Sequence, residues 1–512
     1  MLTKIISATT LGIDAYLVDV EVDLSYGMLQ FHIVGLPDAA IRESKQRILT
    51  ALKHCGLRLP ERKITVNLAP ADLKKEGTMF DLPIAIGILH SVGHIELSSS
   101  YLQETIFLGE LSLDGSIKRV KGILPIAFDA HTLNKKRIIV SAENAQEASL
   151  IEGLEVIGVT HLTALVAHLR NEKTITPTIT DRSLITHKSS PTPVIDFSDV
   201  KGQHQAKRAL QIAAAGQHNV LFVGAPGSGK TMLAQRLPTI MPPLTFTQML
   251  EVSKIYSISN KLPANGLITE RPLRSPHHTI SQPGLVGGGT FPQPGEISLA
   301  HHGILFLDEL TEFKRTTLEV LRQPLESKSV NITRSQQTLT FPASFLLLAA
   351  LNPCPCGFYG DSKRACHCSA LNINRYLEKL SGPLLDRIDI QVPIQSVSYE
   401  TIEQHGEQQS SAELYKKISH AVKVQEQRFG NTALRNGQMT PDLIEKYCPL
   451  NPKAATLIKQ AFEKLNLSMR GYHKLLKVAR TIADLEGAEQ IEAMHIQEAI
   501  TYRSLEQILK RT

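Results

Sequence analysis

Residues 220–231 read VLFVGAPGSGKT, an apolar run that leads into a glycine-rich loop, and the helical pattern MLAQRL follows directly. A strand, a loop of this spacing and a helix start together form a phosphate-binding loop. Its glycines let successive backbone N–H groups converge on phosphate oxygens, and the helix N-terminus adds a partial positive charge. Lys230 is expected to reach the β and γ phosphates, and Thr231 to bind magnesium. The predicted nucleotide-binding residues are Gly224, Ala225, Pro226, Gly227, Ser228, Gly229, Lys230 and Thr231.

An acidic motif follows this loop on a second apolar strand. Residues 304–309 read ILFLDE, so two carboxylates end an apolar run. Asp308 is expected to hold the magnesium ion through its water shell, and Glu309 to polarise the attacking water. Asp308 and Thr231 are therefore the predicted magnesium ligands. Because each motif has its proper strand context and the two come in this order, the sequence predicts an α/β domain that hydrolyses ATP.

Length and composition limit the class of protein. The chain has 512 residues, which predicts about three domains at roughly 150 residues each. Hydrophobic residues make up 42% and charged residues 20%, as in soluble globular proteins, and no apolar run approaches the ~18 residues that cross a bilayer. The N-terminus lacks a signal-peptide pattern, so we expect a cytoplasmic protein with no membrane partner. The net charge of +6 permits nucleic-acid binding but does not demand it.

The hydrophobic pattern changes along the chain and divides it into domains. Residues 1–170 mix alternating strands with amphipathic helices, which predicts an α+β domain. Residues 171–195 include a stretch rich in Thr, Ser and Pro without periodicity, and we expect a linker there. The ATPase domain is expected over 196–393. Helical patterns fill 394–512, including one apolar stripe that ends at Gly487.

Three further motifs carry a resemblance to a known family. The residues FSDVKGQ (197–203), LNP (351–353) and LLDR (384–387), taken with the two ATP motifs, resemble the AAA+ proteins of the magnesium-chelatase and minichromosome-maintenance branch. Nearly the whole chain resembles the bacterial competence proteins of the magnesium-chelatase-like family. The resemblance implies an AAA+ core, a C-terminal helical lid and an N-terminal domain of the ribosomal-S5-like fold that Lon proteases share.

The resemblance also implies an activity and partners. Its members are implied to be homo-hexameric DNA motors, helicases that drive branch migration while incoming strands are integrated by homologous recombination in natural transformation. The implied cofactors are ATP and Mg²⁺. The implied partner is DNA, single-stranded, double-stranded or branched, bound without regard to sequence, and recombination proteins are further candidate partners.

Three polar residues match catalytic positions of the family. Asn352 follows an apolar strand and matches the first sensor, which orients the lytic water; a turn cap before the next proline is the structural alternative. Arg387 matches the arginine finger, which neutralises charge on the γ-phosphoryl group of a neighbouring subunit; an ion pair with an adjacent aspartate is the alternative. Arg470 fits the second sensor, whereas Arg480 on the same helix is assigned to the surface or a subunit contact.

Two stretches resemble DNA-contacting pore elements of the family. His277 and His278, followed by the glycine-rich residues 284–289, match a loop inserted into helix two, and a structural role is the alternative for the pair. Residues 329–340 read as a hairpin. Lys328 and Arg334 are expected to meet DNA phosphates there, which adds salt-dependent affinity without sequence preference. The alternative is a solvated hairpin face.

Four of the six cysteines crowd into one short stretch. They form two C-x-C pairs, separated by a loop of Gly, Asp, Ser, Lys and Arg: Cys354, Cys356, Cys366 and Cys368. Four thiolates can close a tetrahedral zinc site, which predicts a structural Zn²⁺. A disulfide or redox role and ordinary free thiols are the alternatives.

The N-terminal domain raises a rival function, ATP-dependent proteolysis. A Lon-type protease needs a Ser nucleophile activated by a Lys base. The corresponding residues 75–81 read KEGTMFD and contain no Ser. Leu124 takes the place of the lysine, and only Thr78 and Lys121 remain as substitutes. We therefore expect a non-proteolytic domain.

Other activities are compatible with the ATPase core. One is a chelatase-type motor subunit for metal insertion, although the extra N-terminal domain and the cysteine loop depart from that family. Remodelling of a protein partner is related to it. A scaffold that only binds ATP is disfavoured, because Glu309, Asn352 and Arg387 are the residues that turnover requires.

Overall fold

The computed structural model describes residues 2–28, 30–73, 75, 77–180, 195–263, 266–289, 292–334, 337–361, 364–395 and 409–503. The chain forms two compact units, Met1–Ser189 with Phe246–Thr269, and Ser190–Thr245 with Glu270–Thr512. The division between 189 and 190 falls inside the stretch that the sequence predicts to be a linker. Residues 246–269 were expected inside the ATPase domain, but the structure groups them with the first unit.

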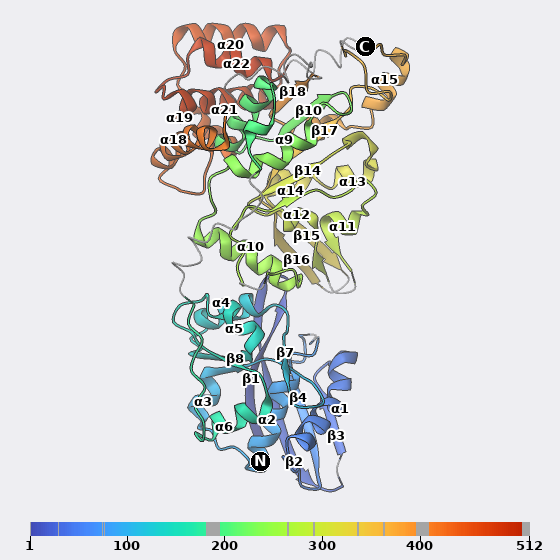
Figure 1. Cartoon of the computed structure of the whole chain (residues 1–512), viewed down its shortest axis with the longest axis vertical. Coiled ribbons are helices and arrows are strands. Elements are labelled where there is room, and N and C mark those ends of the chain that lie inside the picture. The colour runs from blue at the N-terminus through green and yellow to red at the C-terminus, as the bar shows by residue number, and fades with distance from the viewer. Residues whose placement is uncertain are drawn as a thin grey trace. The chain divides into compact units, whose positions relative to one another are not determined.

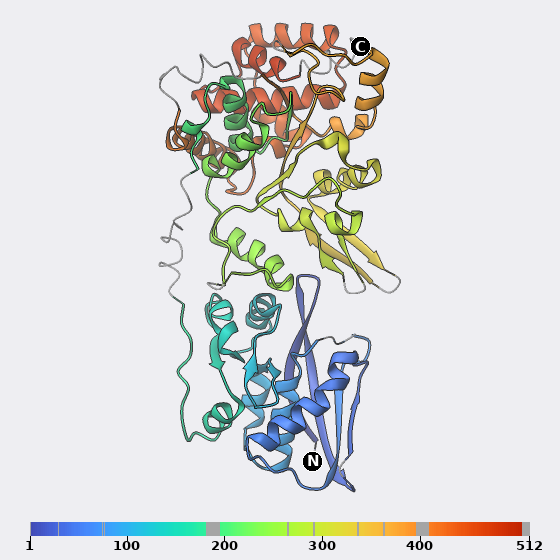
Figure 2. The same cartoon turned by 45° about the vertical axis from the view of Figure 1, so that its right-hand side comes forward.

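The first unit is built on one mixed sheet. Its elements are β1 (Leu2–Leu11), β2 (Asp14–Tyr26), β3 (Gln30–Val34), α1 (Ala39–His54), β4 (Arg62–Ala69), α2 (Asp81–Val92), α3 (Ser99–Glu104), β5 (Thr105–Phe107), β6 (Glu110–Leu111), β7 (Ile117–Lys118), α4 (Ile123–Thr132), β8 (Arg137–Ser141), α5 (Ala142–Ala148), β9 (Glu155–Val159), α6 (Leu162–Leu169) and α10 (Phe246–Ile258). The strand order is β3-β4-β2-β1-β5-β8-β9. β1 and β2 form a long antiparallel ribbon, on which α2 and α4 pack (Figures 1 and 2).

Helix α10 is part of this unit because its apolar face and one polar contact bind it there. Met249, Val252 and Ile255 are buried, and α10 packs on α4. The hydroxyl of Ser257 donates to the buried carboxylate of Glu147. Burial raises the pKa of Glu147, and the backbone N–H of the first turn of α4 also donates to it. Residues distant in the sequence therefore fix where this helix packs.

The second unit carries a parallel sheet. Its elements up to the end of that sheet are η1 (Phe197–Asp199), α8 (His204–Gly216), β10 (Val220–Gly224), α9 (Lys230–Arg236), η2 (Leu237–Ile240), β11 (Leu273–Arg274), α11 (Gln282–Val286), β12 (Gly287–Gly288), β13 (Gln293–Pro294), α12 (Glu296–Leu299), β14 (Ile304–Leu307), η3 (Leu310–Glu312), α13 (Arg315–Glu319), α14 (Arg322–Ser327), β15 (Ser329–Arg334), β16 (Gln337–Pro342), β17 (Leu346–Leu351), α15 (Ala370–Leu377), α16 (Gly382–Leu385) and β18 (Ile390–Ile394). The strand order is β11-β14-β17-β10-β18. Because all neighbours are parallel, the carboxyl ends of β10, β14 and β17 meet at one edge.

The C-terminal part of this unit is helical, as expected. It contains α18 (Ser411–Phe429), η4 (Asn436–Gln438), α19 (Pro441–Tyr447), α20 (Pro452–Lys464), α21 (Met469–Glu486) and α22 (Ala493–Thr501). The apolar stripe of α21 is buried, and the helix ends at Gly487, whose φ of 72° suits a left-handed cap. Arg480 was expected at the surface or in a subunit contact, but it is 1% exposed and its guanidinium pairs with Asp484 in the same helix. No helix within the described ranges is long and apolar enough to cross a membrane.

Candidate nucleotide site

The phosphate-binding loop lies between helix α9 and strand β10, which is flanked in the sheet by β17 and β18. Gly227 and Gly229 have φ values of 75° and 93°, a left-handed region in which side chains are strained. A Cβ on Gly224 would lie 2.3 Å from the carbonyl oxygen of Ile394 in the neighbouring strand. The glycines are therefore needed both for the curl of the loop and for close strand packing.

Lys230 is buried at the start of α9. Its Nζ donates to the carbonyl oxygens of Gly224, at 2.6 Å, and Ala225, at 3.0 Å, and to Oδ1 of Asn352 at 3.1 Å. Burial lowers the pKa of Lys230, while the nearby charges of Asp308 and Glu309 raise it. The structure thus brings the predicted first sensor, at the end of β17, to the predicted phosphate-binding lysine.

Thr231 and Asp308 are adjacent across the sheet edge. Thr231 Oγ1 donates to Asp308 Oδ2 at 2.7 Å. A hydroxyl and a carboxylate are oxygen ligands of the kind that Mg²⁺ prefers, so these residues fit the predicted ion. Glu309, next in the chain, has a φ of 51°, and its side chain is 55% exposed, which leaves its carboxylate accessible to a water molecule.

His278 lies beside this carboxylate. Its Nδ1 is 3.6 Å from Oε2 of Glu309, and its ring stacks on His277 at 4.0 Å between centroids. The short strand β11 pairs with β14 and delivers the histidine loop to the same edge. Sequence reasoning assigned this pair to DNA contact and did not anticipate its place beside Glu309, because a two-residue strand leaves no periodic signal. DNA contact by the pair stays a prediction.

Arg387 and Arg470 meet at one carboxylate. Arg387 Nη2 lies 2.7 Å from Oε1 of Glu326, and Arg470 pairs with the same oxygen. The two guanidiniums hold the pKa of Glu326 below its usual value. The alternative was an ion pair of Arg387 with Asp386 or Asp389. Within the described residues Arg387 pairs instead with Glu326, and Asp389 lies 3.4 Å from Lys474. Sequence reasoning missed Glu326, because nothing in its surroundings along the chain distinguishes it.

Related proteins put this geometry in context. The family models described as "Magnesium chelatase, subunit ChlI", "Subunit ChlI of Mg-chelatase" and "Magnesium chelatase, subunit ChlI C-terminal" match residues 196–402, 20–144 and 408–503. The chain is 42% identical over 515 residues to the competence protein ComM of Haemophilus influenzae, covering 100% of this chain and 99% of that protein. The chain belongs to the ComM family of magnesium-chelatase-like AAA+ proteins.

Two other relatives are a second protein of this type and a more distant magnesium-chelatase subunit. The protein YifB of Salmonella typhimurium is 41% identical over 501 residues, covering 98% of this chain and 96% of the relative. The magnesium-chelatase 38 kDa subunit of Rhodobacter capsulatus is 24% identical over 330 residues, covering 60% of this chain and 86% of that subunit. The ComM family therefore shares the ATPase branch with magnesium chelatase, and ATP and Mg²⁺ are its expected cofactors.

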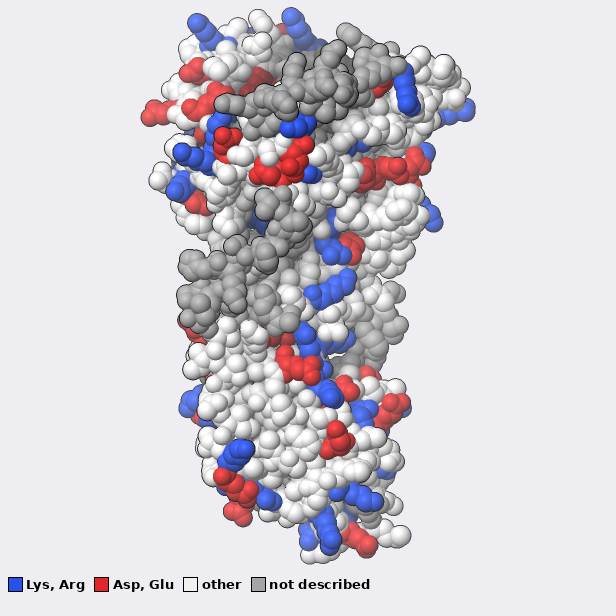
Figure 3. All heavy atoms as spheres, viewed as in Figure 1, with Lys and Arg blue, Asp and Glu red and all other residues white. Residues whose placement is uncertain are grey.

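The predicted DNA-contacting hairpin exists, formed by β15 and β16. Lys328 stands just before β15 as the left-handed cap of α14, is half-buried, and has a pKa lowered by that burial. The backbone of Arg334 pairs with Gln337 at the end of the hairpin, but its side chain lies outside the described residues. On the face drawn in Figure 3, positive and negative side chains are interspersed among the described residues. DNA contact by this ComM-family chain thus stays a prediction.

The four predicted zinc ligands come together. Sγ of Cys354 lies 3.3 Å from that of Cys356 and 3.6 Å from that of Cys366, and all four ligand atoms lie within 4.8 Å of one another. A tetrahedral zinc site with Zn–S bonds of about 2.3 Å needs sulfurs about 3.8 Å apart, whereas a disulfide needs about 2.0 Å. The cluster can therefore hold a zinc ion, and none of its cysteines is in a disulfide.

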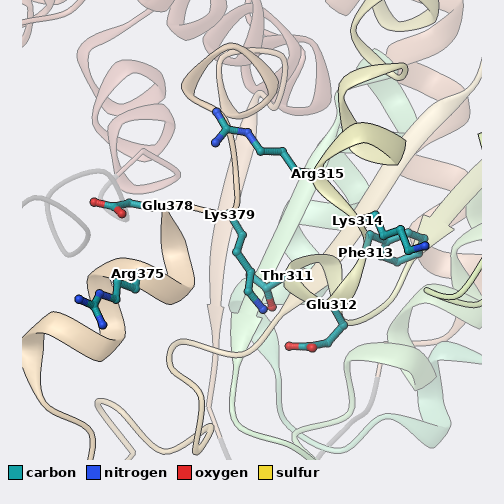
Figure 4. Close-up of a pocket in the computed structure, with 8 residues that line it drawn as sticks. All are labelled: Thr311, Glu312, Phe313, Lys314, Arg315, Arg375, Glu378 and Lys379. Atoms are coloured by element: carbon teal, nitrogen blue, oxygen red, sulfur yellow. The ribbon is translucent and has the colours of Figure 1, made fainter.

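A cavity of about 410 Å³ lies where the segment after Glu309 meets α15. Figure 4 shows its lining residues, Thr311, Glu312, Phe313, Lys314, Arg315, Arg375, Glu378 and Lys379. Arg375 and Glu378 extend outward from α15, while Lys379 reaches toward Thr311. Cations and carboxylates are mixed here, so the lining does not select one sign of ligand charge.

Proposed function

We propose that this chain is an ATP-driven DNA motor that forms a homo-hexamer and promotes branch migration during integration of incoming DNA by homologous recombination. One observation carries the ATPase part: Lys230, Asn352 and the Thr231–Asp308 pair occupy one edge of the parallel sheet. The DNA part rests on the similarity to the competence protein ComM over the full chain.

Each residue at this edge has a role in the proposed hydrolysis. Lys230 binds the β and γ phosphates, and Thr231 and Asp308 hold magnesium, which neutralises phosphate charge when bound. Glu309 polarises the attacking water, and Asn352, which accepts a hydrogen bond from Lys230, orients that water. His278 lies beside this carboxylate, with its Nδ1 3.6 Å from Oε2 of Glu309.

Arg387 and Arg470 act together on a neighbouring subunit in this proposal. Both arginines bind Glu326, and within the described residues neither donates to the phosphate-binding loop. A cavity of about 600 Å³ adjoins Arg387 and Glu326. A ring in which each site receives both arginines from the next subunit makes use of this arrangement, with the finger Arg387 contributing about 10³ to 10⁵ in rate.

The proposed DNA track uses the hairpin and the histidine loop, namely His277, His278, Lys328 and Arg334. Contacts of these side chains with phosphates suit a motor that traverses any sequence. The cysteine cluster completes the proposal as a structural Zn²⁺ site with ligands Cys354, Cys356, Cys366 and Cys368, supported by sulfur spacings of 3.3–3.6 Å.

A proteolytic role has no support in the first unit. Thr78 donates its hydroxyl proton to Glu110, and the ammonium of Lys75 is bound to the carbonyl oxygen of Pro70. Lys121 is exposed. The hydroxyl of the substitute nucleophile therefore has a carboxylate partner, and within the described part of the chain it forms no hydrogen bond with a lysine.

A chelatase-type motor, or remodelling of a protein partner, is the second candidate, favoured by the similarity to the magnesium-chelatase 38 kDa subunit. Purified protein assayed for ATP hydrolysis with branched DNA, single-stranded DNA or a chelatase partner subunit separates these functions. We expect DNA to stimulate hydrolysis and the Lys230→Ala variant to show none. Stimulation by the chelatase subunit but not by DNA would replace the proposal with the second candidate.

A further inference from the structure

We infer that the cysteine cluster is part of the nucleotide site: its metal holds the phosphate-binding loop and the catalytic segment in place, so loss of the metal weakens ATP binding. This inference rests on the proposed zinc site and deepens it. Three contacts around the cluster carry it, and each joins the cysteine loop to a different part of the site.

The first contact is with the phosphate-binding loop itself. Gly357, in the turn after Cys356, is buried, has a φ of 86°, and donates its N–H to the carbonyl of Cys354 at 2.9 Å. A Cβ on Gly357 would lie 2.5 Å from Cδ of Pro226. The cysteine turn therefore lies directly on the loop that must cradle phosphate, with no room for a side chain between them.

The second connection is through the main chain. β17 ends at Leu351, Asn352 binds Lys230, and Cys354 follows two residues later. Cys354 is buried, and its Sγ also accepts the N–H of Tyr359 at 3.3 Å. A metal that fixes this sulfur also fixes the chain just after Asn352, since only Pro353 separates the two residues.

The third contact reaches the segment behind Glu309. α15 begins at Ala370, directly after the last two cysteines, and Ser369 caps it. Its residue Tyr376 accepts a hydrogen bond from Thr311 Oγ1 at 2.5 Å, and both side chains are buried. Thr311 stands two residues after Glu309. The cysteine loop is therefore connected both to Asn352 and to the segment that carries Glu309.

A pair of glycines in the same loop tests the contact with Pro226. Gly357→Ala and Gly360→Ala both place a side chain at positive φ, 86° and 77°, but the region around Gly360 is open. We expect Gly357→Ala to bind a fluorescent non-hydrolysable ATP analogue with Mg²⁺ at least about tenfold more weakly, because overpacking displaces the loop. Gly360→Ala should bind like the unmutated protein, and zinc content should be unchanged in both.

Equal affinity in the two glycine variants would overturn the inference. So would loss of zinc from Gly357→Ala, because the effect would then come from collapse of the metal loop and not from its contact with Pro226.

The metal is tested separately with Cys366→Ser/Cys368→Ser, which removes the two ligands farther along the chain from Asn352. Elemental analysis should find about one zinc per unmutated chain and none in this variant, and analogue affinity should fall with the metal. Cys55→Ser, outside the cluster, is the matched control. In zinc-depleted unmutated protein with excess Mg²⁺, added Zn²⁺ should restore affinity.

The outcomes distinguish the zinc site itself from its coupling to nucleotide binding. Absence of zinc from the unmutated protein would remove the metal itself, while the glycine pair still reports on the contact. Zinc-free protein that binds the analogue normally would leave the metal site standing and overturn its coupling to the nucleotide.

Discussion

Arg387 and Glu326 form an ion pair with Nη2 2.7 Å from Oε1, and Arg470 binds the same oxygen. One carboxylate thus sets the position of two guanidiniums that come from segments far apart in the sequence. Because both arginines are proposed to act on the same γ-phosphoryl group, Glu326 is a positioning residue whose removal should affect them together.

Glu326→Gln should lower the rate of hydrolysis moderately. The side chain of Glu326 is 50% exposed, and exposed ion pairs contribute less than about 1 kcal/mol, so we expect a loss of about two- to fivefold. Because the guanidiniums lower the pKa of Glu326, the pair is charged throughout neutral pH, and the defect should not vary with pH there. Steady-state hydrolysis measures this effect.

Glu319→Gln is the matched control for this variant, since Glu319 pairs with Arg322 at 2.8 Å and lines the same cavity. It should hydrolyse ATP at the unmutated rate. Equal rates in Glu326→Gln and the control would show that the shared carboxylate does not position the arginines.

Arg387→Ala subunits should be inactive alone, with a loss of about 10³-fold or more. Mixing them with Lys230→Ala subunits should restore part of the hydrolysis, because an intact pocket then meets an intact Arg387 at some interfaces. Titration of one variant into the other, with mixed rings verified by tagged subunits, measures the recovery. A flat titration in verified mixed rings would contradict action across the interface.

Lys230→Ala and Glu309→Gln should separate binding from chemistry. Removing the ammonium that lies among the carbonyls of Gly224 and Ala225 should abolish nucleotide binding. Glu309→Gln keeps the side-chain shape but cannot polarise water, so it should bind ATP and fail to hydrolyse it. Equilibrium binding and single-turnover hydrolysis check the two. An unmutated rate in Glu309→Gln would end the assignment of that carboxylate.

Local patterns were enough to predict the ATP motifs and their strand context. The apolar runs at 220–223 and 304–307 are buried strands, and each motif begins where its strand ends. The position of Glu326 could not be predicted, because its contact with Arg470 joins residues 144 apart in the sequence. Tertiary contacts of this kind leave no periodicity.

The grouping of residues 246–269 with the first unit has a similar cause. An apolar helix such as α10 can pack on either unit, and the choice depends on Glu147, which is 110 residues from Ser257. The burial of Arg480 likewise depends on Asp484 and on carbonyl oxygens of Ala488 and Glu489 beyond the end of α21. From the sequence alone, an arginine in a helical pattern is predicted to be exposed, because its buried partners cannot be identified.

The hairpin provides the last prediction, which concerns DNA. Lys328→Gln/Arg334→Gln should weaken DNA binding to a similar degree for all sequences and flatten its salt dependence. Each phosphate contact that is lost should reduce the slope of log affinity against log salt by roughly 0.7 to 0.9. Because Lys328 is half-buried and burial lowers its pKa, its contribution to the salt slope should be the smaller of the two at high pH.

Lys416→Gln/Lys417→Gln, on the exposed side of α18, is the matched control. It removes the same charge elsewhere and should leave the salt slope unchanged. ATP binding should survive in both double variants, while branch migration of a three- or four-strand substrate should fall only in the first. Identical salt slopes and strand movement in the two would place the DNA away from the hairpin and direct attention to His277 and His278.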